Sequence, residues 1–240
     1  ACGRDPNYPP WQDVAQLNAF HPGLREAAAG ALLGIAGQCD GVRCDMTMLL
    51  INRIFSRTWA GRAGREPRRE YWAEIIGAVR GRYPGFTFLA EAYWDLEREL
   101  QQQGFDYCYD KRLYDCLVRE PAGAIRLHLS GETGYQRQLV RFIENHDEPR
   151  AASVFDASKG AAAAVVIATL PGARLFHDGQ LEGRRLKLPV QLGRQPDEAP
   201  DPAVQAFYAR LLPAVRDARF RDGDWFLCET YGWPDNESFR

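Results

Sequence analysis

The sequence predicts an α/β fold in which short parallel strands alternate with helices, as in a (β/α)8 TIM barrel. Five strand-like runs alternate with helical patterns, which is typical of βα units and a parallel sheet. No G-x-G-x-x-G run follows the first of these strands, so a Rossmann sheet has little support. Acidic residues end three of the strands, where barrel enzymes carry their active sites.

The composition is that of an ordinary globular protein. The 240 residues are 45% hydrophobic and 26% charged, and the chain is long enough for a sizeable core. A net charge of −2 argues against nucleic acid as the main partner. No apolar run approaches the roughly 20 residues needed to cross a bilayer, so no membrane partner is expected.

The six cysteines form no C-x-x-C pair. We interpret most of them as small buried hydrophobic side chains in a reducing compartment, which favours the cytoplasm. The chain starts without an initiator Met or a signal peptide and stops after a strand-like run. We therefore expect an internal piece of a longer protein, with its N-terminus and targeting signals outside these residues.

The elements are predicted from periodicity and from Gly and Pro positions. Residues 1–21, rich in Pro, Asn and Asp, are expected to form a loop, and residues 56–69 a basic loop. Helices are predicted at 22–39, 46–55, 70–82, 94–104, 111–120, 158–172 and 202–220. Strands are predicted at 41–45, 85–91, 105–110 and 140–147, with a strand and loop at 173–180 and the first strand of another module at 223–229.

Three carboxylates stand at the ends of separate predicted strands: Asp45, Glu91 and Asp147. We expect them to converge over one barrel mouth. Retaining glycoside hydrolysis requires two carboxylates in different environments, about 5–5.5 Å apart. Arg43 points to the same side of its strand as Asp45 and favours the charged form that a nucleophile needs. Apolar neighbours of Glu91 disfavour its charged form, which suits a general acid.

Further side chains near these strand ends fit a sugar site. His146 and Asp147 are expected to hold sugar hydroxyls and to stabilise the positive charge that develops on the ring. Tyr93 and Trp94 are candidates for stacking on pyranose faces. An Asp at a strand end is often only a helix cap, but three such ends together make that account insufficient. A metal-dependent barrel hydrolase needs several histidines; only four occur here, with no H-x-H pair, so no metal ligand is predicted.

The runs "DGVRCD" (40–45), "FLAE" (88–91) and "ENHD" (144–147) resemble three signatures of the α-amylase superfamily, glycoside hydrolase family 13. Their order matches strands four, five and seven of that family, and the resemblance covers about residues 11–220. It implies a partial barrel of about strands 4 to 8 at residues 22–220. Residues 1–21 would then end an inserted B-type subdomain, and residues 221–240 would start a C-terminal β domain.

The resemblance also implies roles. Asp45 would be the nucleophile, Glu91 the acid/base and Asp147 the transition-state stabiliser, with Arg43 and His146 in support. The implied substrate is an α-glucan or a maltooligosaccharide. The resemblance implies no organic cofactor and leaves open a structural calcium ion in the full-length protein.

Two departures from the family pattern affect the expected activity. The family's signature on strand three would lie before residue 1, so we expect the isolated piece to be inactive. Many amylases carry Lys-His where this chain has Met48-Leu49, which departs from a typical leaving-group subsite. Transfer of the glycosyl group to a sugar or a phosphate remains an alternative with the same mechanism. A non-catalytic homologue is a further alternative, but it predicts loss of the three carboxylates.

Overall fold

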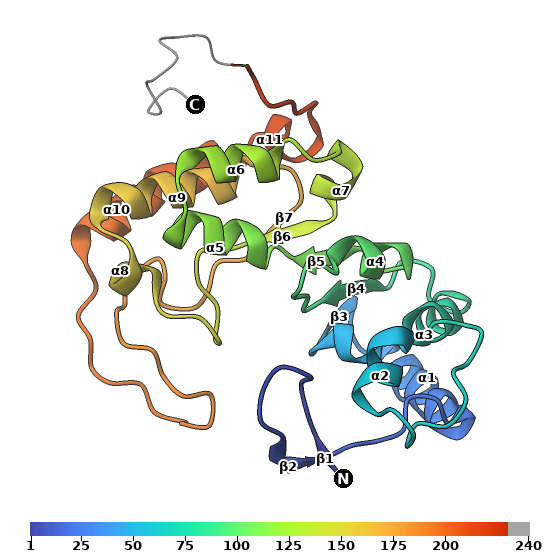
Figure 1. Cartoon of the computed structure of the whole chain (residues 1–240). Coiled ribbons are helices and arrows are strands. Elements are labelled where there is room, and N and C mark those ends of the chain that lie inside the picture. Colours follow the sequence, from blue (N-terminus) through green and yellow to red (C-terminus); the bar gives the residue numbers. More distant parts are fainter. Residues whose placement is uncertain (230–240) are drawn as a thin grey trace. The chain divides into compact units, whose positions relative to one another are not determined.

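The computed structural model describes residues 1–229. The described residues divide into two compact units, one of residues 1–109 and one that begins at residue 110, and each is described by itself. In both, parallel strands alternate with helices (Figure 1). In the first unit β3, β4 and β5 pair in parallel in chain order, and in the second β6 pairs in parallel with β7, as strands of a TIM barrel do. The predicted α/β fold class is therefore confirmed.

The first unit begins with a hairpin and continues with three parallel strands and their helices. Its elements are β1 (Cys2–Gly3), β2 (Trp11–Ala15), α1 (Pro22–Ala36), β3 (Gly41–Cys44), a 3-10 helix η1 (Thr47–Leu50), α2 (Asn52–Thr58), α3 (Tyr71–Arg80), β4 (Thr87–Ala90), α4 (Glu97–Gln102) and β5 (Tyr107–Tyr109). The expected loop of residues 1–21 thus contains two short antiparallel strands.

Aromatic side chains hold α3 against β4 and β5 in the first unit. The Trp72 ring meets the Phe105 ring edge-on at 5.1 Å, and Phe105 lies 6.3 Å from Phe88 of β4. All three side chains are buried. The Trp72 Nε1–H also donates to the Thr47 carbonyl at 2.8 Å. This core helix therefore fixes the 3-10 turn that follows β3.

The second unit has short strands and mostly short helices. Its elements are α5 (Lys111–Arg119), α6 (Ala122–Leu129), α7 (Thr133–Arg137), β6 (Leu139–Arg141), α8 (Ala151–Val154), α9 (Ala157–Thr169), β7 (Ala173–Arg174), α10 (Pro202–Ala214) and α11 (Arg219–Asp222). The strands β6 and β7 pair in parallel, with Val140 opposite Ala173. A buried cluster that includes Leu113, Ile143 and Ile167 joins α5 and α9 to the segment after β6.

A buried ion pair joins the start of α5 to β6. The Arg141 guanidinium contacts the Asp110 carboxylate, and the two side chains are 0% and 1% exposed. Asp110 also caps α5 by accepting from the Leu113 N–H at 3.0 Å, and His128 Nε2 lies 2.9 Å from it. Burial opposes the charge of Asp110, but the hydrogen bond from His128 and the Arg141 charge outweigh it and hold the pKa of Asp110 below its usual value.

One strand prediction is wrong in part and another is wrong. The strand predicted at 140–147 ends at Arg141, where its parallel pairing with the two-residue strand β7 also ends. The strand predicted at 223–229 is absent from those residues, which have no regular structure. Residues 230–240 of the predicted C-terminal β domain lie outside the described residues.

The cysteines divide into two sets of equal size. Cys44, Cys108 and Cys116 are buried, whereas Cys2, Cys39 and Cys228 are exposed. The prediction that most cysteines are buried therefore holds for only half of them. All six have free thiols.

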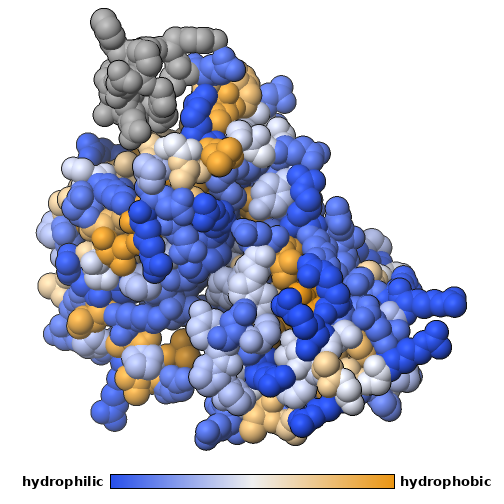
Figure 2. Space-filling view, in the orientation of Figure 1, coloured by the Kyte–Doolittle hydropathy of each residue, from blue (hydrophilic) through white to orange (hydrophobic). Residues whose placement is uncertain are grey.

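The visible face of the molecule is mostly hydrophilic, with hydrophobic residues in small separate patches (Figure 2). Among residues 1–229, no helix has both the length and the apolar character that a membrane span requires.

Candidate active site

Parallel pairing in the first unit places Asp45 and Glu91 side by side. Cys44 of β3 is opposite Ala90 of β4, and each carboxylate residue follows directly. The Glu91 N–H donates to the Cys44 carbonyl at 3.0 Å, and the Thr47 hydroxyl donates to the Glu91 carbonyl at 2.6 Å. The backbone of both strand ends is therefore held, and the two side chains leave the same edge of the sheet.

One guanidinium contacts both carboxylates. Arg43 forms ion pairs with Asp45 and with Glu91, the latter at 3.1 Å between Nη2 and Oε1. The side chain of Asp45 is 75% exposed, whereas that of Glu91 is only 4% exposed. The guanidinium also lies over the Tyr109 ring of β5, 5.7 Å from its centroid. Arg43 and Asp45 therefore lie side by side, as predicted, and Arg43 contacts Glu91 as well.

The Glu91 carboxylate has protein partners for both oxygens. The Met46 N–H donates to Oε2 at 2.5 Å, and the Tyr93 hydroxyl donates to Oε1 at 3.0 Å. Burial raises the pKa of Glu91 above its usual value, against the opposing effects of the Met46 N–H, Arg43 and Tyr93. A carboxyl group that holds its proton more strongly than usual suits a general acid.

Left-handed backbone at non-glycine residues is concentrated at these two strand ends. Among residues 1–229, only three non-glycine residues have positive φ: Met46 (43°), Trp94 (63°) and Asp95 (56°). Met46 follows Asp45 directly, and the other two begin three residues after Glu91. Such conformations cost free energy in residues with a Cβ, and they cluster at functional sites. The strain at this sheet edge therefore supports a functional role for it.

In the second unit, His146 and Asp147 form a pair in the segment after β6. His146 Nε2 lies 3.0 Å from Asp147 Oδ2, and the two side chains are 42% and 46% exposed. The Asn145 side chain accepts from the N–H groups of Asp147 at 2.9 Å and of Glu148 at 3.0 Å. Asn145, which is itself buried, therefore fixes the turn that presents Asp147.

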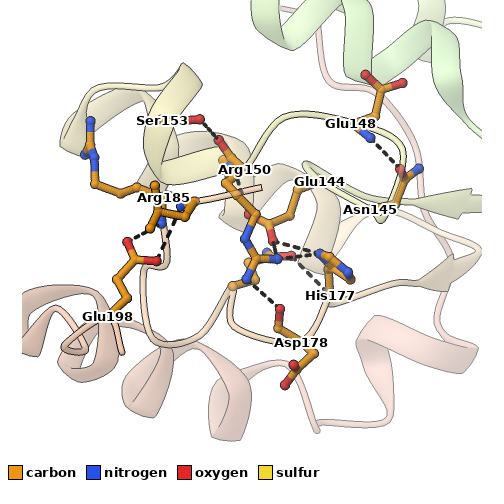
Figure 3. A network of polar contacts seen from close by, with 12 residues as sticks. Glu144, Asn145, Glu148, Arg150, Ser153, His177, Asp178, Arg185 and Glu198 are labelled. Carbon is orange, nitrogen blue, oxygen red and sulfur yellow. Dashed lines mark hydrogen bonds and ion pairs between the residues drawn. The ribbon is translucent and has the colours of Figure 1, made fainter. Parts of the chain in front are cut away.

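A buried polar network that the sequence analysis missed supports this turn (Figure 3). Glu144, with a side chain 1% exposed, binds Arg150 at 2.7 Å, the Ala151 N–H at 2.6 Å and His177 Nδ1 at 3.1 Å. Arg150 also donates to the Asp178 carbonyl at 2.8 Å. Burial raises the pKa of Glu144, while the Ala151 N–H and Arg150 oppose the shift. A glutamate directly after the apolar pair Phe142-Ile143 was the signal that could have revealed this network.

The network borders a cavity of about 180 Å³ in the second unit. Its lining includes His146, Arg150, His177 and Lys187. The Lys187 ammonium group donates to the Asp147 carbonyl. The cavity therefore lies beside the predicted sugar-binding pair.

The structure brings Arg43, Asp45, Glu91 and Tyr93 together in the first unit and pairs His146 with Asp147 in the second. Convergence of all three carboxylates over one barrel mouth stays a prediction, as does stacking of a sugar on Trp94. Within residues 1–229, no group of three or more His, Cys, Asp or Glu side chains could hold a metal ion.

Known proteins similar to this chain are α-amylases and related hydrolases. No family model matches the chain. The α-amylase MalA of Haloarcula japonica is 30% identical over 218 residues, which cover 86% of this chain and 29% of that protein. The chain thus spans less than a third of this curated relative.

Solved structures show the same fold at lower identity. The α-amylase from H. orenii has a TM-score of 0.67 at 18% identity, over 92% of this chain and 53% of the other. The maltogenic α-amylase AmyB from Thermotoga neapolitana has a TM-score of 0.64 at 20% identity, over 91% of this chain and 50% of the other. The cyclic α-maltosyl-(1→6)-maltose hydrolase from Arthrobacter globiformis has a TM-score of 0.59 at 19% identity, over 83% of this chain and 44% of the other.

Proposed function

We propose that this chain, which belongs to the α-amylase family, glycoside hydrolase family 13, carries the nucleophile and the acid/base of a retaining α-glycosidase. The observation that carries the proposal is the contact of one guanidinium, that of Arg43, with two carboxylates in opposite environments. The exposed Asp45 is assigned as nucleophile and the buried Glu91 as acid/base. Residues 22–220 would form the C-terminal part of the catalytic barrel.

The two environments suit the two roles. The Arg43 cation stabilises a negative charge on Asp45, and attack on the anomeric carbon requires that charge. Burial favours the protonated form of Glu91, from which a proton can pass to the leaving oxygen. The mechanism needs the two carboxyl groups about 5–5.5 Å apart, and neighbouring strand ends in register favour such a short separation.

The proposed reaction is a double displacement. An Asp45 oxygen bonds to the anomeric carbon as the glycosidic C–O bond breaks, and Glu91 gives its proton to the departing oxygen. The ionised Glu91 then takes a proton from water, whose oxygen attacks the anomeric carbon and releases Asp45. Each step regenerates the form of Glu91 that the next step uses.

Asp147 and His146 are proposed to act on the sugar ring. Their paired side chains, both about half-exposed, offer a carboxylate and an imidazole to sugar hydroxyls. A carboxylate beside the ring also stabilises the positive charge of an oxocarbenium-like transition state. Asn145 and the Glu144 network hold this pair, so they contribute to its placement without contacting the substrate.

The proposed substrates are α-glucans and maltooligosaccharides. Among the structural neighbours, the Arthrobacter globiformis hydrolase is described in complex with maltose. The α-amylase from Geobacillus thermoleovorans, at TM-score 0.62 and 18% identity, is described in complex with acarbose. These ligands support a glucose-based oligosaccharide as substrate here.

Transfer to a sugar or phosphate acceptor is the alternative with the same residues. Asp45, Glu91 and Asp147 serve both reactions equally, because only the molecule that attacks the glycosyl-enzyme differs. Products would be analysed with and without added glucose, maltose or inorganic phosphate, in the longest natural protein that contains this chain, here called the parent protein. Longer oligosaccharides or a sugar phosphate, formed in place of free sugar, would favour transfer.

The stereochemistry of hydrolysis tests the proposed mechanism. Two displacements at one carbon restore its configuration, so the parent protein should release the α-anomer first from a maltooligosaccharide. Proton NMR during the first minutes, before mutarotation, measures this directly. A β-anomer as the first product would reject the assignment of Asp45 as nucleophile.

A further inference from the structure

We propose that Tyr93 is a positioning residue that orients the Glu91 carboxyl group and sets the pH range in which it acts as an acid. This inference rests on the proposed role of Glu91. The Tyr93 hydroxyl donates to Glu91 Oε1 at 3.0 Å. It is thus one of a small set of groups in the first unit that face this carboxylate.

The groups of the first unit that face Glu91 divide into donors and one acid. Arg43 Nη2 and the Tyr93 hydroxyl contact Oε1, and the Met46 N–H contacts Oε2. Asp45 adds a like charge nearby. Of these, the Tyr93 hydroxyl is the one neutral side-chain donor, so its removal changes the hydrogen bonding of Glu91 without changing the charge of the site.

The backbone directly after Tyr93 forms a strained turn. Trp94 and Asp95 both have left-handed backbone, with φ of 63° and 56°. The Leu96 N–H donates to the Tyr93 carbonyl at 3.3 Å and closes this turn. Two consecutive non-glycine residues in this conformation are costly, and such cost persists where surrounding structure enforces it. The strained turn therefore follows directly on the residue whose hydroxyl contacts Glu91.

The Tyr93 hydroxyl favours the ionised form of Glu91, because a donor stabilises the carboxylate. Its loss should therefore raise the pKa of Glu91. A general acid must be protonated, so the alkaline limb of kcat/KM should move to higher pH. A shift of about one pH unit is expected for one hydrogen bond to a buried carboxylate. The value of kcat should also fall, because Glu91 then loses one of the contacts that aim it.

The test is Tyr93→Phe in the parent protein, with Tyr83→Phe as the matched control. Tyr83 is also half-buried, but it precedes β4 and lies at the opposite end of that strand from Glu91. The carboxyl titration of Glu91 is followed by 13C NMR and assigned through Glu91→Gln. Asp95→Gly is the second variant. Glycine adopts positive φ without strain, so this variant should preserve the turn and the pH midpoint of the Glu91 titration.

A raised Glu91 midpoint in Tyr93→Phe alone, with the alkaline limb shifted equally, would support the inference. If Tyr93→Phe raises the Glu91 midpoint but the parent protein has no glycosidase activity, the role of the Tyr93 contact would stand and the proposed function would be rejected. An unchanged midpoint in folded Tyr93→Phe, or an equal shift in Tyr83→Phe, would overturn the inference. If Tyr93→Phe does not fold, the same titration is made in Tyr93→Leu, which also lacks the hydroxyl: a raised Glu91 midpoint would support the inference, and an unchanged one would overturn it.

Discussion

In the parent protein, Glu91→Gln should accumulate a covalent glycosyl adduct on Asp45 from α-glucosyl fluoride, whereas Asp45→Asn should form none. Fluoride leaves with little acid assistance, so the first displacement survives loss of the proton donor. The second displacement needs Glu91 as a base for water, and the adduct therefore persists. The amide that replaces the Asp45 carboxylate is not a nucleophile, so no bond forms with any donor.

Turnover of maltooligosaccharides in Glu91→Gln should fall about 10²–10⁴-fold, the usual contribution of general acid–base catalysis. Intact-protein mass spectrometry followed by peptide mapping measures the adduct and its position. Glu99→Gln is the matched control, because Glu99 pairs with Arg53 on α2 and makes no contact with the site. An adduct on another residue, or equal labelling of the two variants, would contradict the assigned roles.

A second large effect is expected from Asp110→Asn, which removes the charge that compensates Arg141. The Arg141 side chain is 0% exposed, so its charge would remain buried without a counter-charge. Breaking a buried pair in this way costs about 3–5 kcal/mol. The measurement is the urea concentration at which peptides from α5 and β6 lose protection from hydrogen exchange in the parent protein.

The control for this variant is Asp115→Asn. Asp115 pairs with Lys111 at 2.6 Å, but the two side chains are 32% and 22% exposed. Loss of a pair so accessible to solvent should cost less than about 1 kcal/mol. Equal losses in the two variants would show that burial does not govern the Asp110–Arg141 pair.

The effect of pH on Asp110→Asn follows from the lowered pKa of Asp110. A carboxyl group whose pKa is lower in the folded than in the unfolded state stabilises the fold above the unfolded pKa, which is about 3.9 for Asp. This stabilisation is lost as the pH falls through the folded pKa. The difference between the wild type and the variant should therefore be full at pH 7 and at pH 5 and should shrink only below about pH 4.

The sequence predicted the strand ends well because the determining signals are local. The run "TFLA" places β4, the Asp40-Gly41 turn places the start of β3, and a carboxylate residue follows each strand directly. The contact of Arg43 with Asp45 follows from the two-residue period of a strand. Its second contact, with Glu91, depends on the register of β3 and β4, and a single strand does not encode that register.

The features that the sequence analysis missed depend on contacts between distant residues. The β1–β2 hairpin was missed because residues 1–10 contain three prolines, although a paired strand begins at Trp11. The strand predicted at 140–147 ends early because its partner β7 pairs only with Val140 and Arg141. The left-handed turn at Trp94 and Asp95, which follows Tyr93, was also missed, because ordinary propensities give no signal for it at non-glycine residues.

The division of the cysteines has a practical consequence for spectroscopy. Burial raises the pKa of Cys44, beside the proposed nucleophile, to about 12, and the thiols of Cys108 and Cys116 are shifted in the same direction. At neutral pH these thiols should not react with maleimides, because the reacting species is the thiolate. After Cys2→Ser, the exposed thiols left in this chain are Cys39 in the first unit and Cys228 in the second. A donor and an acceptor dye on these two cysteines would report, by energy transfer, whether a bound oligosaccharide changes the separation of the units, with the site itself unmodified.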